Sequence, residues 1–438
     1  MPLQSSGLIS LLDIQNEFGG SNPIGINEYY GVAPGIPASG LISLADFYGA
    51  SACDTTTAPT LTNTYTVSGT NQGYGRYFQV TSSKYYFGHA AYNSNEGRVH
   101  IRNHDDTGEI LVTRPGGVAD DGFWRIAVDE STNTMVVADP GRDANGSQSA
   151  GGASWFNATT GAYLNISKTS PYGGWTQWRR GTQGPFWGEP IYADDGKFFI
   201  CCPYDRCGTS TQYGSVWVYN SSGTLLTSKL GNSGTASTPG TANGVGFTIS
   251  SVADGRVMAP VTYAATGGKI VVYDYNLNVL HQWPQPSGTV DYWGATASIG
   301  QGVIAVGAPA WPYNSGNPGY VYLYDYNYNL QNTIVSPTNT PGFGSVVKVG
   351  NGRIIVGNYN YTGTQNRQGR IYIYNLTGSL LATIDDPNAL NQGNFGQYPD
   401  GVISKYDLMF LTRAQSINNY SSYFDKYSTP ENAGCSGP

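Results

Sequence analysis

Residues 293–330, WGATASIGQGVIAVGAPAWPYNSGNPGYVYLYDYNYNL, contain every part of a pattern that this chain repeats seven times. An aromatic–Gly pair opens the unit, an apolar strand follows, and a loop then leads to Gly and a strand of alternating aromatic residues. With small variations the copies open at Tyr74-Gly75, Phe123-Trp124, Trp187-Gly188, Val245-Gly246, Trp293-Gly294, Phe343-Gly344 and Phe395-Gly396. Self-similarity at a period of about 50 to 60 residues, with four short strands per unit, is the signature of a β-propeller.

The strands within each unit can be assigned from their patterns. The third strand alternates aromatic and β-branched residues, as in GRIYIYN (Gly369–Asn375), and an Asn/Asp turn then supplies the positive-φ residue of a tight hairpin. A short outer strand such as Ser379–Ile384 follows. The second strand is a near-continuous apolar run, typical of a strand covered on both faces. We expect it at Tyr85–Ala91, Thr134–Ala138, Lys197–Cys202, Arg256–Val261, Val303–Gly307, Arg353–Gly357 and Leu408–Thr412.

The seventh unit lacks an outer strand, because the chain ends soon after the third strand at about Tyr420–Tyr427. A spare strand, Thr60–Val67, precedes the first unit. We therefore expect an all-β, seven-bladed propeller in which Thr60–Val67 pairs antiparallel with Tyr420–Tyr427 and closes the ring. Cys53 and Cys435 flank these two strands at the same end of the blade, so a disulfide between them is a further expectation, although assembly in the cytoplasm opposes it.

A second, shorter repeat occupies the N-terminus as three hexads that each read as the start of a short helix. Ser or Gly stands at the N-cap and an acidic residue at N3, which is the pattern of a capping box. Apolar residues at N′ and N4 match a hydrophobic staple, and we expect them to be the key residues of a docking module: Ile9, Ile14, Ile24, Tyr29, Ile42 and Phe47. The expected division is a docking module at 1–50, a linker at 51–59 and the propeller at 60–438. So short a module buries little core and needs a partner surface.

Composition excludes several classes of protein. Charged residues make up 12% of the chain and the net charge is −7 without a basic run, so nucleic acid is not an expected partner. No apolar stretch approaches the roughly 20 residues that span a bilayer. The N-terminus lacks the positive region of a signal peptide, so we expect synthesis in the cytoplasm. The five cysteines lack zinc spacing, and no motif for a metal or cofactor is present.

The aromatic–Gly, VGAP and G-x-V-Y-[LI]-Y elements resemble the FG-GAP repeats of integrin α-chain propellers over about residues 74–438. Those repeats often carry a D-x-D-x-D-G calcium loop between the second and third strands. The corresponding loops here lack the carboxylates, and DPGRDANG offers only Asp139, Asp143 and Asn145 in a different spacing. The resemblance therefore does not extend to calcium.

The pattern from Ser6 to Gly49, which includes S-G-x-I-S-L-x-D-I and S-G-x-I-S-L-x-D-F-Y-G, resembles an N-terminal module of virion and tail-associated proteins of marine tailed bacteriophages, cyanophages especially. Gly25 and Asn27 are the departures in the middle copy. The resemblance implies a virion part, present in multiple copies, whose N-terminus docks on other virion proteins while the C-terminal body faces outward. It also implies a protein made in the host cytoplasm and released by lysis.

Catalytic motifs are absent from the sequence. It contains neither G-x-S-x-G nor a Walker loop. His100 and His104 with Asp105 and Asp106 could form an acid–base or metal group, but a strand followed by a polar hairpin explains them more simply. We therefore expect a protein that is not an enzyme.

Aromatic loops are the stronger functional signal, because exposed Trp and Tyr stack on sugars and anchor protein interfaces. The loops between strands two and three and between blades should share one face, where Trp283 and Trp293 are also expected, although Trp187 and Trp293 beside the repeat Gly can equally be blade core. The candidate ligand-binding residues are Trp175, Trp178, Arg179, Arg180, Trp311 and Tyr313.

Three functional hypotheses follow. The first is a tail-associated phage structural protein of the fibre, adaptor or receptor-binding type, whose propeller recognises a host-surface glycan or receptor or a neighbouring subunit. The second is a capsid decoration or head-fibre protein. The third, from another class, is a propeller glycan hydrolase, since such enzymes assemble acids from different blades.

Overall fold

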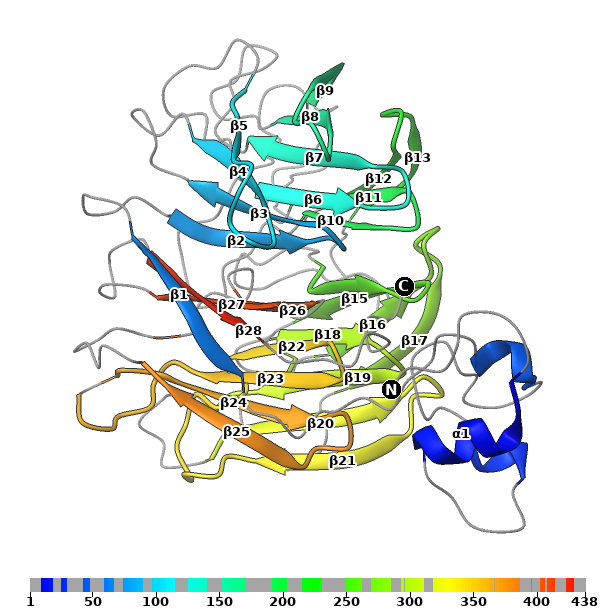
Figure 1. The fold of residues 1–438 in the computed structure, drawn as a ribbon, viewed down its shortest axis with the longest axis vertical. Helices are drawn as coiled ribbons and strands as arrows, with labels where there is room; N and C mark the ends of the chain where they lie inside the picture. Colours follow the sequence, from blue (N-terminus) through cyan, green and yellow to red (C-terminus); the bar gives the residue numbers. More distant parts are fainter. Residues whose placement is uncertain are drawn as a thin grey trace.

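A computed structural model shows seven four-stranded antiparallel sheets arranged as the blades of a propeller, as the repeats predict (Figure 1). The structure describes residues 9–18, 25–29, 42–47, 59–66, 74–89, 97–114, 125–139, 152–169, 191–202, 215–230, 249–261, 269–284, 293–294, 296–310, 318–365, 367–386, 395, 402–405, 408–413 and 423–428.

The first four blades each contain four strands consecutive in the chain. Blade 1 consists of β2 (Tyr74–Val80), β3 (Lys84–His89), β4 (Arg98–Asn103) and β5 (Ile110–Val112). Blade 2 consists of β6 (Arg125–Asp129), β7 (Thr134–Asp139), β8 (Gly152–Asn157) and β9 (Tyr163–Thr169). Blade 3 consists of β10 (Ile191–Asp194), β11 (Lys197–Cys202), β12 (Ser215–Asn220) and β13 (Leu225–Leu230). Blade 4 consists of β14 (Ser251–Ala253), β15 (Arg256–Val261), β16 (Lys269–Tyr273) and β17 (Val279–Pro284).

Blades 5 and 6 follow the same plan, whereas blade 7 takes one strand from the N-terminal side. Blade 5 consists of β18 (Thr296–Gly300), β19 (Val303–Ala308), β20 (Tyr320–Asp325) and β21 (Leu330–Val335). Blade 6 consists of β22 (Val346–Gly350), β23 (Arg353–Asn358), β24 (Arg370–Asn375) and β25 (Leu380–Asp385). Blade 7 consists of β26 (Val402–Lys405), β27 (Leu408–Arg413), β28 (Tyr423–Ser428) and β1 (Thr60–Thr66).

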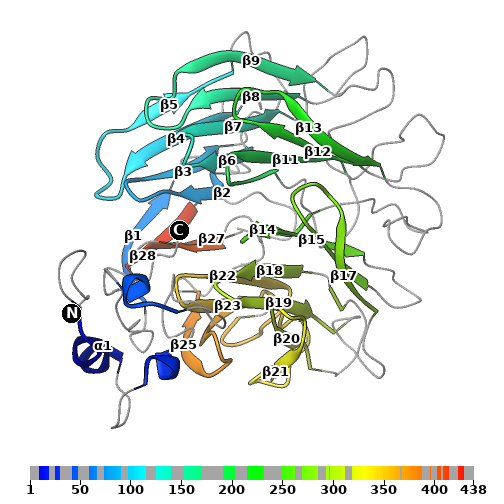
Figure 2. The same ribbon diagram turned by 90° about the vertical axis from the view of Figure 1, so that its right-hand side faces the viewer.

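The ring is continuous. The first strands of successive blades contact one another all the way round, including β26 of blade 7 with β2 of blade 1. Figure 2 shows β27 of blade 7 between β2 of blade 1 and β22 of blade 6. Within the described residues, one apolar cluster fills the space at each of the seven junctions between blades. The second strands predicted from apolar runs all exist, with ends within two residues of the expected ones.

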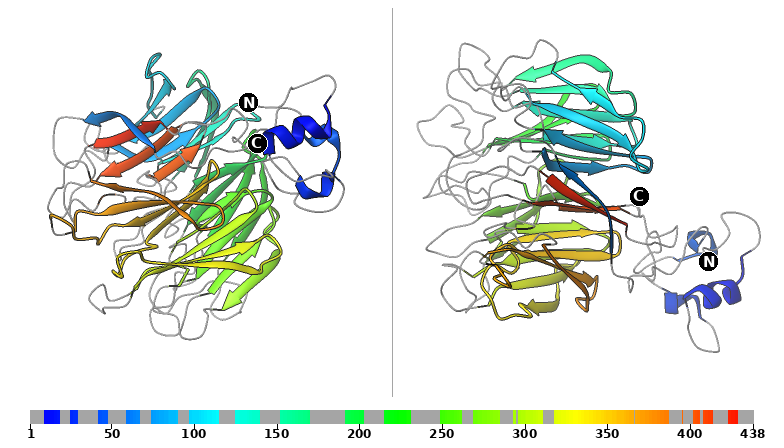
Figure 3. Two further views of the ribbon diagram at one scale, coloured as in Figure 1. Left: turned by 60° about the horizontal axis from the view of Figure 1, so that its bottom comes forward. Right: turned by 60° about the vertical axis from the view of Figure 1, so that its left-hand side comes forward.

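Closure by the N-terminal strand is confirmed. β1 pairs antiparallel with β28, from Thr60 opposite Ser428 to Thr66 opposite Tyr423, and is the outermost strand of blade 7 (Figure 3). A bulge lies between Leu61 and Asn63. The pairing covers the edge that β28 would otherwise leave open.

The aromatic–Gly anchor has a steric basis at the blade junctions. Gly344 has φ 87°, and its N–H donates to the Gly357 carbonyl at 3.1 Å. A Cβ on Gly307 of blade 5 would overlap the Gly344 carbonyl oxygen of blade 6, so the two backbones meet directly. The aromatic partners Trp293, Phe343 and Phe395 are fully buried. The motif therefore combines a left-handed turn, a close backbone approach and a core side chain.

The turns between third and fourth strands also form as the sequence predicts. In NSSG, Asn220 Oδ1 accepts hydrogen bonds from the N–H groups of Ser222 and Thr224, at 3.1 and 2.8 Å, and Gly223 has φ 71°. In DYNLN and DYNYN, which lack Gly, Leu277 and Tyr328 take the positive-φ position. The Asn or Asp side chain organises these turns by binding the backbone two and four residues on.

The N-terminal hexads form three short helices with a small core of their own. These are α1 (Leu11–Phe18) and two 3₁₀ helices, η1 (Ile26–Tyr29) and η2 (Leu44–Phe47), which lie to one side of the ring (Figure 3). Ser10 N–H donates to Asp13 at 2.8 Å and Asp13 N–H donates to Ser10 Oγ at 3.2 Å, which is the predicted capping box. Ser43 N–H likewise donates to Asp46 Oδ2 at 2.6 Å.

The predicted apolar positions pack against one another. Ile14, Tyr29 and Phe47, one from each hexad, form a buried cluster with Ile9 and Ile42 partly buried beside it; Ile24 lies outside the described residues. Among the described residues, no helix is long and apolar enough to cross a membrane.

Candidate functional site

The two faces of the propeller carry different connections between strands. We call the one that carries the connections between second and third strands and between blades the loop face, and the opposite one the turn face. Cys53 and Cys435 of the expected disulfide lie outside the described residues. So do all six recognition residues predicted for the loop face, which are Trp175, Trp178, Arg179, Arg180, Trp311 and Tyr313.

Two further tryptophans are built into the blades. Trp293 is fully buried in the junction of blades 4 and 5, as the blade-core interpretation predicted. Trp283 lies in β17 and packs on Tyr324 of blade 5, with ring centroids 4.8 Å apart. Trp293 is therefore a core residue of the blade junction, and the partly buried Trp283 uses its ring to cover the next blade.

Blade 6 presents the best-described part of the loop face. Arg370, the first residue of β24, is opposite Asp385, the last residue of β25. Its Nε and Nη2 donate to the two carboxylate oxygens at 2.5 and 2.7 Å, and its guanidinium carbon lies 3.9 Å from the ring centroid of Tyr361. Asp385 keeps 47% of its side chain exposed, whereas Arg370 keeps 19%. We call Tyr361, Arg370 and Asp385 the blade-6 platform.

The loop that carries Tyr361 is fixed from below by a buried side chain. Gln368 Oε1 accepts hydrogen bonds from Thr364 Oγ1 at 3.1 Å and from Gln365 N–H at 3.0 Å. Gly369 N–H donates to the Tyr361 carbonyl at 3.1 Å, and Gly369 has φ 83° with the Phe395 backbone directly against it. The exposed tip, residues 362–365, is thus held in one conformation by contacts that need no ligand.

Beneath this loop two amide oxygens are buried without a donor. They belong to Asn358, which is fully buried and donates from Nδ2 to Thr340 Oγ1 at 2.8 Å, and to Asn360. Both side chains adjoin Gly342 of the preceding inter-blade loop. Buried acceptors are normally paired, so these two mark a place where a donor would be favourable.

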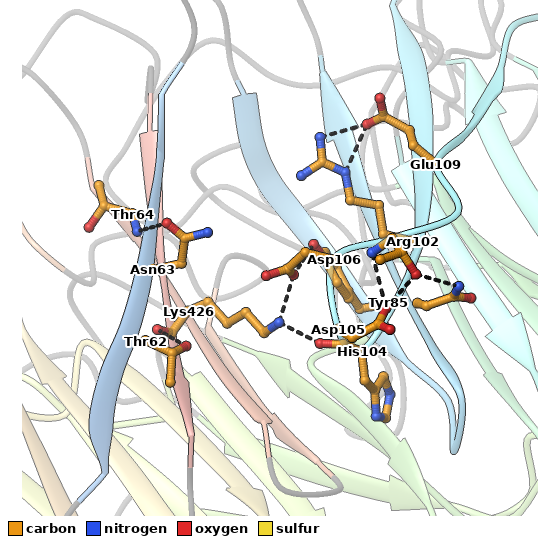
Figure 4. Close-up of polar contacts among 12 residues, drawn as sticks. Thr62, Asn63, Thr64, Tyr85, Arg102, His104, Asp105, Asp106, Glu109 and Lys426 are labelled. Carbon is orange, nitrogen blue, oxygen red and sulfur yellow. Dashed lines mark hydrogen bonds and ion pairs between the residues drawn. The ribbon is translucent and has the colours of Figure 1, made fainter.

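A polar network crosses the seam between blades 7 and 1 on the turn face (Figure 4). The buried Lys426 of β28 donates from Nζ to Asp106 Oδ1 at 2.6 Å and to the His104 carbonyl at 2.5 Å. Tyr85 OH donates to the same Asp106 oxygen at 2.8 Å. Burial opposes ionisation of Asp106, but the hydrogen bond from Lys426 and the further ones from tyrosines outweigh it and lower the pKa of Asp106. Burial raises the pKa of Tyr85 far above its ordinary value.

The closing strand itself is held by few side chains. Tyr65 is the least exposed residue of β1; its ring stacks on Phe424 at 4.7 Å, and Arg102 lies 5.4 Å from its centroid. Thr64 Oγ1 donates to the buried Asp425 at 2.6 Å, and Thr62 Oγ1 donates to the Lys426 carbonyl at 3.0 Å.

The histidines of blade 1 have structural surroundings. His100 is buried in β4, stacked on Phe87; its Nδ1 lies 2.9 Å from Glu109, and its Nε2 accepts a hydrogen bond from Arg98 Nε at 3.1 Å. Nε2 of His104, four residues further along the chain, lies 2.9 Å from the Thr81 carbonyl oxygen. The strand-and-hairpin interpretation is therefore confirmed. Across the described ranges, no three His, Cys, Asp or Glu side chains gather as they would round a metal ion.

Cys201 is the one cysteine whose side chain the structure describes. It is a free, buried thiol in the junction of blades 3 and 4, and burial raises its pKa. This is the behaviour expected of a small apolar side chain.

The N-terminal module buries Ile14, Tyr29 and Phe47 but leaves two leucines exposed. Leu12 is 57% exposed and Leu44 38% exposed, on helices whose staple residues point into the small core. Two exposed leucines on so small a unit leave an apolar surface for a partner.

The sequence interpretation missed the blade-6 platform and the Lys426–Asp106 pair. A comparison of equivalent positions could have found the first, since the position of Arg370 is Tyr320 in blade 5 and Ser215 in blade 3. The signal for the Lys426–Asp106 pair was the lysine in FDKYS, because other third strands carry an apolar residue at that position.

Comparison with known proteins gives similarities of fold. No family model matches the chain, and no curated protein matches it in sequence. Among solved structures, it is similar to the WD40 β-propeller domain of Doa1, at 14% identity and a TM-score of 0.44, over 85% of this chain and 98% of that one. It is also similar to the β-propeller domain of the Trilobed protease from Pyrococcus furiosus, at 10% identity and a TM-score of 0.48, over 81% and 94%.

A third similarity is to an acylaminoacyl peptidase from Pyrococcus horikoshii, at 8% identity and a TM-score of 0.44. It covers 82% of this chain and 50% of the peptidase. At these identities the similarities concern the propeller fold alone.

Proposed function

We propose that this chain is a tail-associated structural protein of a bacteriophage particle and not an enzyme. Its N-terminal module docks on other virion proteins, and its propeller presents the loop face to a host-surface glycan or receptor. The protein is made in the host cytoplasm, occupies the particle in multiple copies and is released by lysis.

The observation that carries the proposal is the packing of the three hexads. Their apolar residues form a core separate from the seven junction clusters, while Leu12 and Leu44 remain exposed. A core of three buried side chains stabilises a unit only weakly, so a partner that covers the leucines would complete it. The sequence resemblance of residues 6–49 to modules of phage virion proteins supports a virion as that partner.

The closed propeller is suited to the proposed display of the loop face to a host-surface ligand. Its ring is closed by β1, and its outer strands expose side chains to solvent. A closed ring without an open edge is a rigid support from which loops can recognise a surface. The blade-6 platform belongs to the loop face, and the sequence predicts the same face for the Trp-rich segment 175–187, which lies outside the described residues.

Incorporation into particles tests the docking role. Particles assembled with a chain lacking residues 1–50 should contain no detectable propeller, whereas the full chain should incorporate. Leu12→Ser should impair incorporation and leave the capped helix intact, because this side chain is exposed. Phe47→Ala should impair it by removing a third of the module core. Normal incorporation of the truncated chain would refute the docking role.

Two alternatives predict different results. A capsid decoration or head-fibre protein would be labelled on the head rather than the tail in electron micrographs of particles with tagged chain. A propeller glycan hydrolase would release reducing sugar from host-surface polysaccharide, which the proposed protein would bind unchanged.

A further inference from the structure

We propose that the blade-6 platform binds the vicinal hydroxyls of a neutral saccharide through Arg370 and Asp385, with Tyr361 packing against the sugar ring. This inference rests on the proposed recognition function of the loop face and names the ligand class and the residues.

The Arg370–Asp385 pair is not required by the blade architecture. The equivalent cross-strand pair is Tyr320 opposite Val335 in blade 5, Lys269 opposite Pro284 in blade 4, Ser215 opposite Leu230 in blade 3 and Gly152 opposite Thr169 in blade 2. None of these can form an ion pair, yet each blade is complete. A half-exposed pair also contributes little to stability. Its presence in one blade of a chain with only 12% charged residues is therefore better explained by binding.

The chemistry of the pair suits adjacent hydroxyl groups. Two N–H groups of Arg370 are used by Asp385, and the guanidinium also hydrogen-bonds to Tyr372. A guanidinium has five N–H groups, so two donors remain. Each carboxylate oxygen of Asp385 retains a lone pair beyond the one that Arg370 uses. Donors and acceptors thus lie side by side, and a diol can donate one hydrogen bond to the carboxylate and accept another from the guanidinium.

Charge balance favours a neutral ligand over an anionic one. Residues 359–386 contain two cations, Arg367 and Arg370, and two anions, Asp385 and Asp386, for a sum of zero. Because Arg370 is already paired with a carboxylate, a phosphate or uronate would meet Asp385 as well as the guanidinium. A neutral sugar meets no such repulsion.

The ring and the loop complete the site. Tyr361 is partly exposed and oriented by the guanidinium 3.9 Å from its centroid, so it can offer an ordered aromatic surface to sugar C–H groups. Gln368 fixes the loop tip before any ligand arrives, which removes an ordering cost from binding.

The test is an array of neutral oligosaccharides (gluco-, manno- and galacto-series), with sialyllactose and oligouronates, probed with the full chain. We expect binding among the neutral sugars. Asp385→Asn and Tyr361→Ala should each weaken the strongest signal at least tenfold in titration calorimetry. The matched control is Asp195→Asn, which removes a carboxylate from the exposed Lys197–Asp195 pair on the turn face and should leave binding unchanged. Thermal unfolding of all three variants should stay close to that of the parent chain.

The possible outcomes separate the inference from the function it rests on. Neutral-sugar binding that survives Asp385→Asn and Tyr361→Ala would overturn the platform and leave glycan recognition to another part of the loop face. Binding only to anionic sugars would overturn the ligand class. A third outcome is that the chain incorporates into particles but binds no sugar. If it then retains a host protein, and Tyr361→Ala abolishes that retention, the ligand of the platform is a protein and not a saccharide.

Discussion

Tyr65 is the residue on which closure of the ring most depends, and replacing it provides a quantitative test. Tyr65→Ala removes the one side chain of β1 that packs on the propeller, together with its stack on Phe424 and its contact with Arg102. Half-burial of an aromatic ring contributes about 1 kcal/mol, the stack about 0.5 to 1 and the cation–π contact about 0.5 to 1. The expected loss is therefore about 2 to 3 kcal/mol.

This loss acts on local opening of β1 rather than on the whole ring. At 1.4 kcal/mol per factor of ten, opening of the strand should become roughly 30- to 150-fold more frequent. Hydrogen–deuterium exchange of the β28 amides, which β1 covers, measures it directly. Leu61→Ala is the matched control on the same strand; Leu61 is 41% exposed, and the loss of its partly buried side chain should change exchange only about fivefold.

A cross-strand disulfide supplies the reverse experiment. Thr60 and Ser428 are directly opposite in the β1–β28 pair, so Thr60→Cys with Ser428→Cys should lock the strand and suppress the added exchange in the Tyr65→Ala background. Equal exchange of β28 in the Tyr65→Ala and Leu61→Ala proteins would refute the reasoning, because it would mean that backbone pairing alone holds the strand.

Two further predictions concern the blades themselves. Gly307→Ala should lower the free energy of unfolding in urea by about 3 kcal/mol, because the added Cβ overlaps the Gly344 carbonyl. Gly255 has open space around it, so Gly255→Ala should cost only about 1 kcal/mol for its positive φ. Equal losses would contradict the close approach of the two backbones. Burial lowers the pKa of His89 to about 3 and the pKa of His100 to about 4. As the pH falls, the unfolded chain therefore binds protons at these histidines before the folded protein does, so the free energy of unfolding should decrease from about pH 6.5 towards pH 4. Urea unfolding at each pH measures this decrease. A flat profile over that range would show that these histidines are accessible to protons in the folded protein.

Most of the architecture could be predicted because the same residue pattern recurs in each of the seven units. The run VIAVGAP is apolar because β19 is covered on both faces, and the aromatic–Gly pair recurs because each junction needs the same left-handed turn and buried ring. Counting strands then revealed that the last unit was one short and that Thr60–Val67 could supply it.

The platform and the seam could not be predicted in the same way. Arg370 and Asp385 face each other in a register that is shifted by a bulge near Tyr374, and the same shift recurs at the equivalent position of blades 2 to 5. The pair can therefore be found only by aligning third and fourth strands across blades with the bulge included. Lys426 and Asp106 are 320 residues apart and meet only when the ring closes. Contacts of this kind depend on assembled geometry, which residue patterns within one unit do not contain.

The polar groups at the seam have a physical reason that the other junctions lack. β1 has a single inward anchor, and a slip of one residue would turn Tyr65 outward. Apolar patterning alone therefore specifies its register weakly, whereas the outer strands of other blades are joined to their partners by tight turns. Thr64 on Asp425 and Thr62 on the Lys426 carbonyl are directional contacts that a slipped strand would lose. Lys426 in turn is fixed by Asp106 of blade 1, so the strand that receives β1 is itself aligned with the next blade. The only blade assembled from both ends of the chain thus uses hydrogen bonds and an ion pair to set a register that a hairpin sets elsewhere.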